Sequence, residues 1–217
     1  MFDWKMPFIA IAGFATLVAA AIFITLPSIT GHVDKTRDKT QKIPLMSLFK
    51  KPEIRLSCLI LSLQSFAQFM LFAGSINYFI FNLGFPRDDL SMIYIIGGAL
   101  SFAAMMLTGR IIDFYGNRLL SFIVTIVYVF ILYDGYMHQP FMSVPFIFSS
   151  FMLCAAIMGV IASTIASETP GDKERAAYMS LQSTCRHLAA GAGGLISSLI
   201  LTTNLDGSLN NIEALAI

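Results

Sequence analysis

Charged residues are scarce in this chain of 217 residues. Asp, Glu, Lys and Arg together make up 12% of the sequence, whereas roughly a quarter of a soluble protein is charged, so a soluble globular fold is excluded. The formal net charge of +1 leaves no basic surface for phosphates, which excludes nucleic acid as a partner. Only three cysteines occur, and Cys58, Cys154 and Cys185 lie far apart in apolar stretches without metal-ligand spacing. We therefore expect no disulfide, no metal site and no cofactor.

Hydrophobic residues, by contrast, make up 56% of the sequence, and its 19 Phe suit a surface that faces lipid. A bilayer core of about 30 Å is crossed by about 20 apolar helical residues, so long uncharged runs locate the spans. Six such runs are present, the last interrupted only by Arg186: residues 8–26, 56–81, 90–108, 119–133, 144–166 and 176–203. The sequence therefore predicts an all-α integral membrane protein with six transmembrane helices.

Basic residues between the runs set the predicted orientation. Eleven of the fourteen Lys and Arg residues fall in the connections 27–55, 109–118 and 167–175, which lie on one face of the membrane. Because positive charge is enriched on the cytoplasmic side, these connections are predicted to be cytoplasmic and both ends of the chain outside. A first span that inserts with its N-terminus outside and no preceding signal is unusual, and residues 211–217 begin a new apolar run. We therefore expect a fragment of a longer chain.

The connection 109–118 has a G-x-x-x-D-x-x-G-x-R pattern, formed by Gly109, Asp113, Gly116 and Arg118. Gly116 permits a tight turn, and Asp113 can accept hydrogen bonds from a helix N-terminus or from an arginine, which would latch two helices together. The alternative for this segment is a plain short basic loop. The pattern resembles the cytoplasmic signature of the major facilitator superfamily.

Three other segments resemble the same family. Residues 2–8 are similar to the entry to its sixth helix, 27–53 to the cytoplasmic linker between its two six-helix halves, and 174–180 to the start of its eleventh helix. The resemblance covers nearly the whole chain and is closest to bacterial sugar-efflux and drug-antiporter-like members. It implies the C-terminal half of a twelve-helix fold, truncated before the last helix. Its parts would be the last helix of the N-terminal half (1–26), the linker (27–55) and an incomplete C-terminal bundle (56–217).

The resemblance also implies a function, namely secondary active transport of a small-molecule substrate by alternating access. It implies proton-coupled efflux across the cell (inner) membrane, carried out together with the missing N-terminal half. The alternatives from other classes are a six-span membrane enzyme and a channel subunit. The sequence holds no H-E-x-x-H or G-x-S-x-G motif, and its spans hold no periodic arginines and no carbonyl-filter signature. We therefore favour a transporter over an enzyme or a channel.

Arg186 lies near the middle of the last predicted span. A charge at that depth costs several kcal/mol without a partner, which makes substrate binding the functional interpretation. Arg186 shares a helix row with Gln182, Ala190 and Gly194, so it is predicted to face protein or a cavity. The alternatives are a structural ion pair and snorkelling of the side chain to the cytoplasmic surface. His187 points about 100° away round the helix and is expected to serve packing.

Three amides of the second span complete the candidate site. Gln64 and Gln68 are four residues apart and share a face with Ser75, which suits hydrogen bonding to a polar solute. Asn77 points the opposite way on an unbroken helix, but a kink at Gly74 would bring it round. The structural alternative is hydrogen bonding between helices, worth about 0.6–2 kcal/mol per bond. The candidate substrate-binding residues are therefore Gln64, Gln68, Asn77, Gln182 and Arg186.

Small residues recur at every fourth position in the last two spans. Such rows let helix backbones approach closely, which is how helices associate in lipid. The rows are Ala155, Gly159, Ser163 and Ser167 in one span and Ala190, Gly194 and Ser198 in the other. We expect both rows to mark helix contacts.

The acidic residues bear on coupling, because none of the thirteen Asp and Glu residues lies deep inside a predicted span. Proton relays in transporters usually need an intramembrane carboxylate or histidine. If transport is proton-driven, as the resemblance implies, the proton carrier must lie in the missing half. Arg186 would then be a fixed positive charge that holds an anionic substrate group or pairs with that distant acid.

Overall fold

The computed structural model describes residues 5–25, 44–136, 140–171 and 174–215. The chain divides into two units, Met1–Lys42 and Ile43–Ile217. Most of the predicted linker, residues 26–43, lies outside the described residues, as does the segment 1–4 with its single Trp.

The first unit contains one helix, α1, which spans Met6–Thr25. Its 20 residues include no charged side chain and span about 30 Å at 1.5 Å per residue. The hydroxyls of Thr16 and Thr25 donate hydrogen bonds of 2.8 and 2.7 Å to the carbonyls of Ala12 and Ala21 one turn earlier. Because its polar side chains are satisfied within the helix, α1 is suited to the bilayer core, as the first apolar run predicts.

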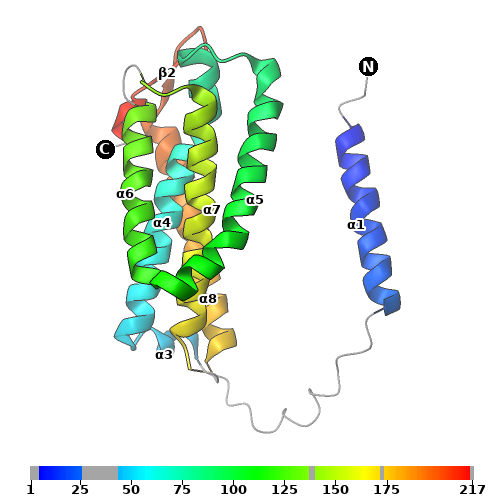
Figure 1. The fold of residues 1–217 in the computed structure, drawn as a ribbon, viewed down its shortest axis with the longest axis vertical. Coiled ribbons are helices and arrows are strands. Elements are labelled where there is room, and N and C mark those ends of the chain that lie inside the picture. The colour runs from blue at the N-terminus through cyan, green and yellow to red at the C-terminus, as the bar shows by residue number, and fades with distance from the viewer. Residues whose placement is uncertain (1–4, 26–43, 137–139, 172–173, 216–217) are drawn as a thin grey trace. The chain divides into compact units, whose positions relative to one another are not determined.

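The second unit is a bundle of five long helices (Figure 1). A short helix, α3, spans Leu45–Leu48 and precedes the bundle. The long helices are α4 (Pro52–Asn77), α5 (Leu90–Tyr115), α6 (Asn117–Tyr136), α7 (Val144–Glu168) and α8 (Arg175–Ile200). A π-helical turn, Tyr78–Asn82, extends α4, and a 3-10 turn, Arg87–Asp89, precedes α5. The strands β1 (Thr202–Thr203) and β2 (Leu209–Asn210) pair as a hairpin, and the 3-10 turn Ile212–Leu215 follows.

Five of the described helices are long and apolar enough to cross a membrane. They are α1, α4 with its π-helical turn, α5 with its preceding turn, α6 and α7. The chain is therefore an α-helical multi-pass membrane protein, as the composition predicts. The sixth predicted span, 176–203, is helical in α8 but ends at Ile200, and α8 is too polar to be counted among the five. The sixth predicted run is thus a helix of 26 residues, and Arg186 and its polar neighbours reduce its hydropathy below that of the other five.

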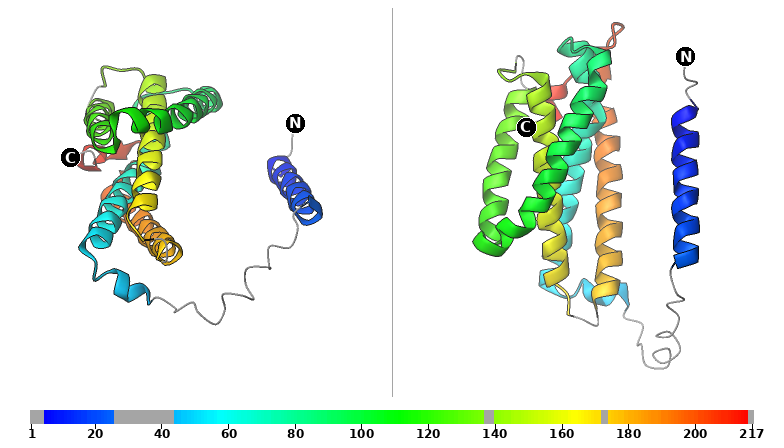
Figure 2. Two further views of the ribbon diagram at one scale, coloured as in Figure 1. Left: turned by 60° about the horizontal axis from the view of Figure 1, so that its bottom comes forward. Right: turned by 45° about the vertical axis from the view of Figure 1, so that its right-hand side comes forward.

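Helix α8 instead packs along α4, and the two form the most extensive helix contact in the bundle (Figure 2). Their backbones approach closely at Gly193, where a Cβ atom would collide with the carbonyl oxygen of Phe66. Ser197, one turn further on, is fully buried. Glycine is therefore required at position 193 by contact with another helix rather than by backbone conformation.

The predicted rows of small residues do not lie at this helix contact. The expectation that both rows mark helix contacts is therefore wrong. Nothing lies within 4 Å of a Cβ placed at Gly194 or at Gly159, and Ser198 and Ser163 are exposed. The physical reason is the phase of the helix. Adjacent residues point about 100° apart round a helix, and the α4 contact follows Gly193 and Ser197 rather than the neighbouring row of Gly194 and Ser198.

The two ends of the bundle have separate hydrophobic clusters. At the end that carries α3, called the α3 end, the cluster consists of Leu48, Ile54, Cys58, Ala166, Tyr178 and Leu181. The Ser57 and Tyr178 hydroxyls share a buried hydrogen bond of 2.6 Å, and Lys51 forms an ion pair of 2.6 Å with Glu174. Leu48 is buried in this cluster, and α4 starts at Pro52.

The opposite end, called the hairpin end, is closed by the residues after α8. The side-chain amide of Asn82 donates to the Leu209 carbonyl and its oxygen accepts from the Leu209 amide, both at 2.8 Å. Ile212 and Leu215 are buried against aromatic side chains, among them Tyr78 and Tyr136. The described part of the apolar run 211–217 is therefore a turn packed on the bundle.

Candidate solute-binding cavity

A cavity of about 320 Å³ lies between α4 and α8. Five of its seven lining side chains can form hydrogen bonds. The lining residues are Ser65 and Phe69 from α4 and Gln182, Ser183, Arg186, His187 and Ala190 from α8. This volume is near the lower limit of small-molecule sites, roughly 300–1,000 Å³.

Arg186 is the only charged residue in the lining, and it is half-buried. Its Nε donates a hydrogen bond of 3.3 Å to the Ser65 Oγ. No carboxylate lines the cavity, and Arg186 forms no ion pair with any other residue that the structure describes. A guanidinium carries five N–H donors, so four remain for a group that enters the cavity.

Gln182 lies one turn before Arg186, and its side chain is 7% exposed. Its amide makes no hydrogen bond within the described part of the chain, although it lines the cavity. Buried amides are normally hydrogen-bonded, so Gln182 is poised for a partner from the cavity. The structure thus brings together two of the predicted substrate-binding residues, Gln182 and Arg186. His187, which is expected to serve packing, is exposed and lines the same cavity.

The other three predicted substrate-binding residues lie outside the cavity lining. Gln64 and Gln68 are half-buried on α4, and Asn77 is exposed at the last residue of that helix. Helix α4 continues through Gly74 to Asn77, its π-helical turn begins at Tyr78, and Asn77 does not line the cavity.

The polar residue of α4 that lines the cavity is Ser65, and not Gln64 or Gln68 as the sequence predicts. It is 5% exposed and faces α8. Ile54, Cys58, Leu61 and Ser65 are spaced by four, three and four residues and are all buried. This spacing is typical of a helix seam, and following it from the apolar residues would have identified Ser65.

The predicted latch residues lie around the α5–α6 junction at the α3 end: Gly109 and Asp113 are in the last two turns of α5, Gly116 joins the helices, and Arg118 is in the first turn of α6. Gly116 has a φ of +81°, which L-residues rarely adopt, and α6 begins at the next residue. Gly109, Asp113 and Arg118 are exposed. Asp113 makes no hydrogen bond or ion pair with another described residue. Arg118 lines a hollow of about 570 Å³ that Glu168 of α7 also lines.

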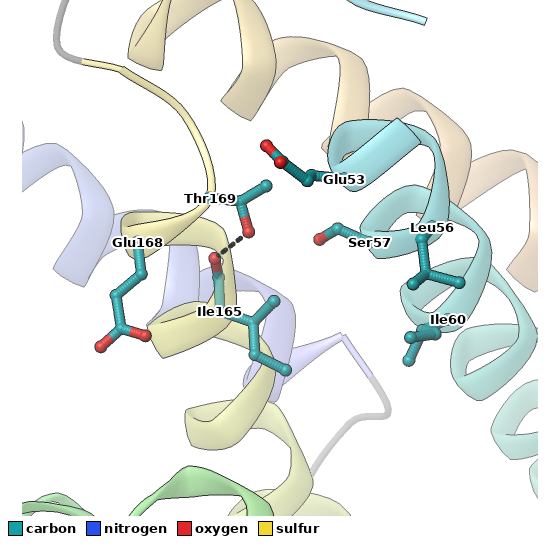
Figure 3. A pocket seen from close by; sticks show the side chains of 7 residues that line it. All are labelled: Glu53, Leu56, Ser57, Ile60, Ile165, Glu168 and Thr169. Atoms are coloured by element: carbon teal, nitrogen blue, oxygen red, sulfur yellow. Dashed lines mark hydrogen bonds between the residues drawn. The ribbon is translucent and has the colours of Figure 1, made fainter. Parts of the chain in front are cut away.

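A second hollow, of about 430 Å³, opens between α4 and α7 at the same end (Figure 3). Glu53 and Glu168 both line it, but they come from different helices and their carboxylates do not point toward one another. The Thr169 hydroxyl donates to the Ile165 carbonyl at 2.7 Å.

Two cysteines that are far apart in the sequence meet in the fold. The Cys58 and Cys185 side chains interact with each other across the α4–α8 interface and line the same groove. All three thiols are free, and Cys154 is buried in the hairpin-end cluster. Cys58 and Cys185 are far apart in the sequence but meet in the fold because α4 and α8 pack side by side.

The fold and the cavity together define a class: a multi-pass helical membrane protein with a polar cavity between two of its helices. The family follows from a sequence profile of the Major Facilitator Superfamily, which matches residues 1–194, from before α1 to the last turns of α8. The chain belongs to the Major Facilitator Superfamily. No curated protein and no solved structure matches it significantly. Because members of this superfamily are transporters, transport across a membrane is the function that this membership supports.

Proposed function

We propose that the chain takes part in secondary active transport of a small solute by alternating access, as proton-coupled efflux. The observation that carries the proposal is the cavity between α4 and α8. It holds a guanidinium that has no ion-pair partner among the described residues, next to the Gln182 side chain, which makes no hydrogen bond to a described residue. Intramembrane charges that face a cavity mark substrate pathways in membrane proteins. Arg186 and Gln182 are the proposed solute contacts, with Ser65 holding Arg186 in place.

The amides on α4 have a secondary role in this proposal. Gln64 and Gln68 are half-buried and four residues apart, so both present polar groups on one side of α4. We propose that they, with Asn77 near the hairpin end, contact solute on its way to or from the cavity rather than in the bound state.

A second helical half is proposed to complete the solute pathway. In alternating access two halves rock about a site near the middle of the membrane. Arg186 is eleven residues from the start of α8, which is roughly 16 Å along the helix and thus near mid-membrane. The division of the chain into a last N-half helix (1–26), a linker (27–55) and a C-terminal bundle (56–217) belongs to the same proposal. Because no acid lines the cavity, we assign the proton carrier to the second half.

The proposed orientation places the α3 end in the cytoplasm of the cell. Lys50, Lys51, Arg55, Arg110, Arg118 and Arg175 all lie on elements or turns at this end, whereas Arg87 lies at the hairpin end (Figure 1). The bilayer keeps such charge on the cytoplasmic side. In this orientation the turn with Gly109, Asp113, Gly116 and Arg118 is cytoplasmic, where a latch between conformations would act.

The test is an unbiased search for the transported solute. Small molecules inside and outside cells are compared by mass spectrometry for cells that produce the protein together with the proposed second half, the same pair with Arg186→Gln, or neither. We expect at least one small solute to be exported only with the unaltered protein, and a protonophore to stop this export. Identical profiles for the two proteins at equal membrane abundance would refute the proposal.

A further inference from the structure

The cavity between α4 and α8 has an unusual balance of hydrogen-bonding groups. Arg186 has four N–H donors without an acceptor among the described residues, and the buried Gln182 amide has no protein partner either. The hydroxyl of Ser183 and the imidazole of His187 add further donors at the rim. No carboxylate is present in the lining. The cavity therefore offers positive charge and donors, with no negative charge to neutralise them.

An uncompensated guanidinium at this depth in a membrane protein is costly, which limits what the cavity can hold. A neutral solute would leave the charge of Arg186 unpaired, and a cation would be repelled by it. An oxyanion neutralises the charge, and its oxygens match the planar fork of the guanidinium with two parallel hydrogen bonds. Gln182, one turn away on the same face of α8, can donate to a third oxygen lone pair.

The apolar lining residues determine which kind of group can be attached to the anionic head of the solute. Phe69 is 48% exposed and borders the cavity beside the polar groups, and Ala190 adds a small apolar surface one turn beyond Arg186. A volume of about 320 Å³ accommodates a compact molecule only. An apolar or aromatic group attached to the oxyanion would lie against Phe69.

We infer that the cavity formed by Arg186, Gln182, Ser65 and Phe69 binds a small organic anion, with a carboxylate or phosphoryl head and an apolar or aromatic body. This inference rests on the proposed transport function and names the class of its substrate. The head group pairs with Arg186 and Gln182, Ser65 holds the guanidinium through its Nε, and Phe69 contacts the body.

The test measures binding without any gradient, so that it is separate from transport. Thermal unfolding of the full chain in detergent is followed by circular dichroism with benzoate, phenylphosphonate or neutral benzamide, at constant ionic strength. Benzoate and phenylphosphonate distinguish the two head groups, and benzamide keeps the ring without the charge. We expect at least one anion to raise the unfolding temperature saturably and benzamide to leave it unchanged.

Variants locate the binding site. Arg186→Gln is expected to weaken anion binding at least a hundredfold, and Gln182→Leu about tenfold, which corresponds to about 1.4 kcal/mol. Arg175→Gln, at the exposed first residue of α8, is the matched control and should bind normally. Equal stabilisation of the Arg186→Gln variant, or no stabilisation of the folded unaltered chain by either anion, would overturn the inference. Anion binding without export would refute the proposed function alone, whereas export of a neutral solute without anion binding would refute the inference alone.

Discussion

Arg186 Nε donates a hydrogen bond of 3.3 Å to Ser65 Oγ, which joins the middle of α8 to the middle of α4. This bond occupies one edge of the guanidinium and leaves the planar fork of the two terminal nitrogens directed to other partners. The α4–α8 interface thus combines a close backbone contact at Gly193 with a polar cavity two turns earlier.

Two substitutions of Arg186 are expected to distinguish the role of its positive charge from that of its planar guanidinium group. Arg186→Lys keeps the positive charge but loses the planar fork, so we expect weakened solute binding and residual export. Arg186→Gln loses both and should abolish export. Initial export rates at matched membrane abundance check this, with Arg175→Gln as a control that should leave export unchanged. Full export by the Arg186→Gln variant would show that Arg186 serves packing only.

Asp113 is expected to act on the transport cycle rather than on insertion or binding. Asp113→Asn removes a carboxylate from the turn at the α3 end, where it touches none of the cavity residues. The change should disturb the balance of conformations by about 1–3 kcal/mol and reduce transport severely. Initial rates and membrane abundance of this variant are compared with those of Asp88→Asn, an exposed acid at the hairpin end. A normal rate for Asp113→Asn would argue against a latch.

Gly193 and Gly194 offer a matched pair for the helix contact. A Cβ at Gly193 meets the backbone of Phe66, which cannot move aside as a side chain would, whereas a Cβ at Gly194 meets open space. We expect Gly193→Ala to destabilise the bundle by about 1–3 kcal/mol and Gly194→Ala to be neutral or stabilising by up to about 1 kcal/mol. Thermal unfolding in detergent measures both, and equal effects would contradict the observed phase of α8.

The Cys58–Cys185 pair permits a covalent test of the α4–α8 packing. The two thiols interact across the interface, so mild oxidation should join them within one chain. After cleavage between α4 and α8, the two fragments should remain linked until a reductant is added. Cys154 supplies the control, because the linkage should persist in Cys154→Ser and disappear in Cys58→Ser. Absence of the linked product would show that the thiols do not meet.

Asn82 is expected to hold the hairpin end closed. Its amide pairs with both backbone groups of Leu209 at 2.8 Å, as a neighbouring strand would. Asn82→Ala should weaken the docking of residues 202–210 by roughly 1–2 kcal/mol and raise their amide hydrogen exchange about five- to thirtyfold. Asn77→Ala, at an exposed amide of the same helix, should leave this exchange unchanged. The same exchange rates in both variants would refute the role of Asn82.

Another interaction in the same hairpin, between Ser208 and Asp206, acts only within the turn that contains both residues. The Ser208 hydroxyl and amide donate to the Asp206 carboxylate at 2.6 and 3.0 Å, which lowers the pKa of Asp206 from its ordinary value. Both residues lie within the turn between β1 and β2, so this interaction stabilises the turn itself and not its contact with the bundle.

The sequence by itself determined the membrane class, the long helices of the apolar runs, the α5–α6 junction at Gly116 and the position of Arg186 within a helix. These features depend on local properties. A long apolar run has only one stable form in lipid, a positive φ favours glycine, and a charge inside a span needs a partner whatever the fold.

Only the tertiary structure decided which side chains meet Arg186. Gln64 and Ser65 are adjacent in the sequence, yet Ser65 faces α8 because α8 packs on the seam that runs from Ile54 through Leu61. The same packing selects Gly193 over Gly194 and brings Cys58 to Cys185. Helix periodicity defines rows of side chains, but the crossing of two helices 121 residues apart decides which row is inside, and that crossing is a property of the whole bundle.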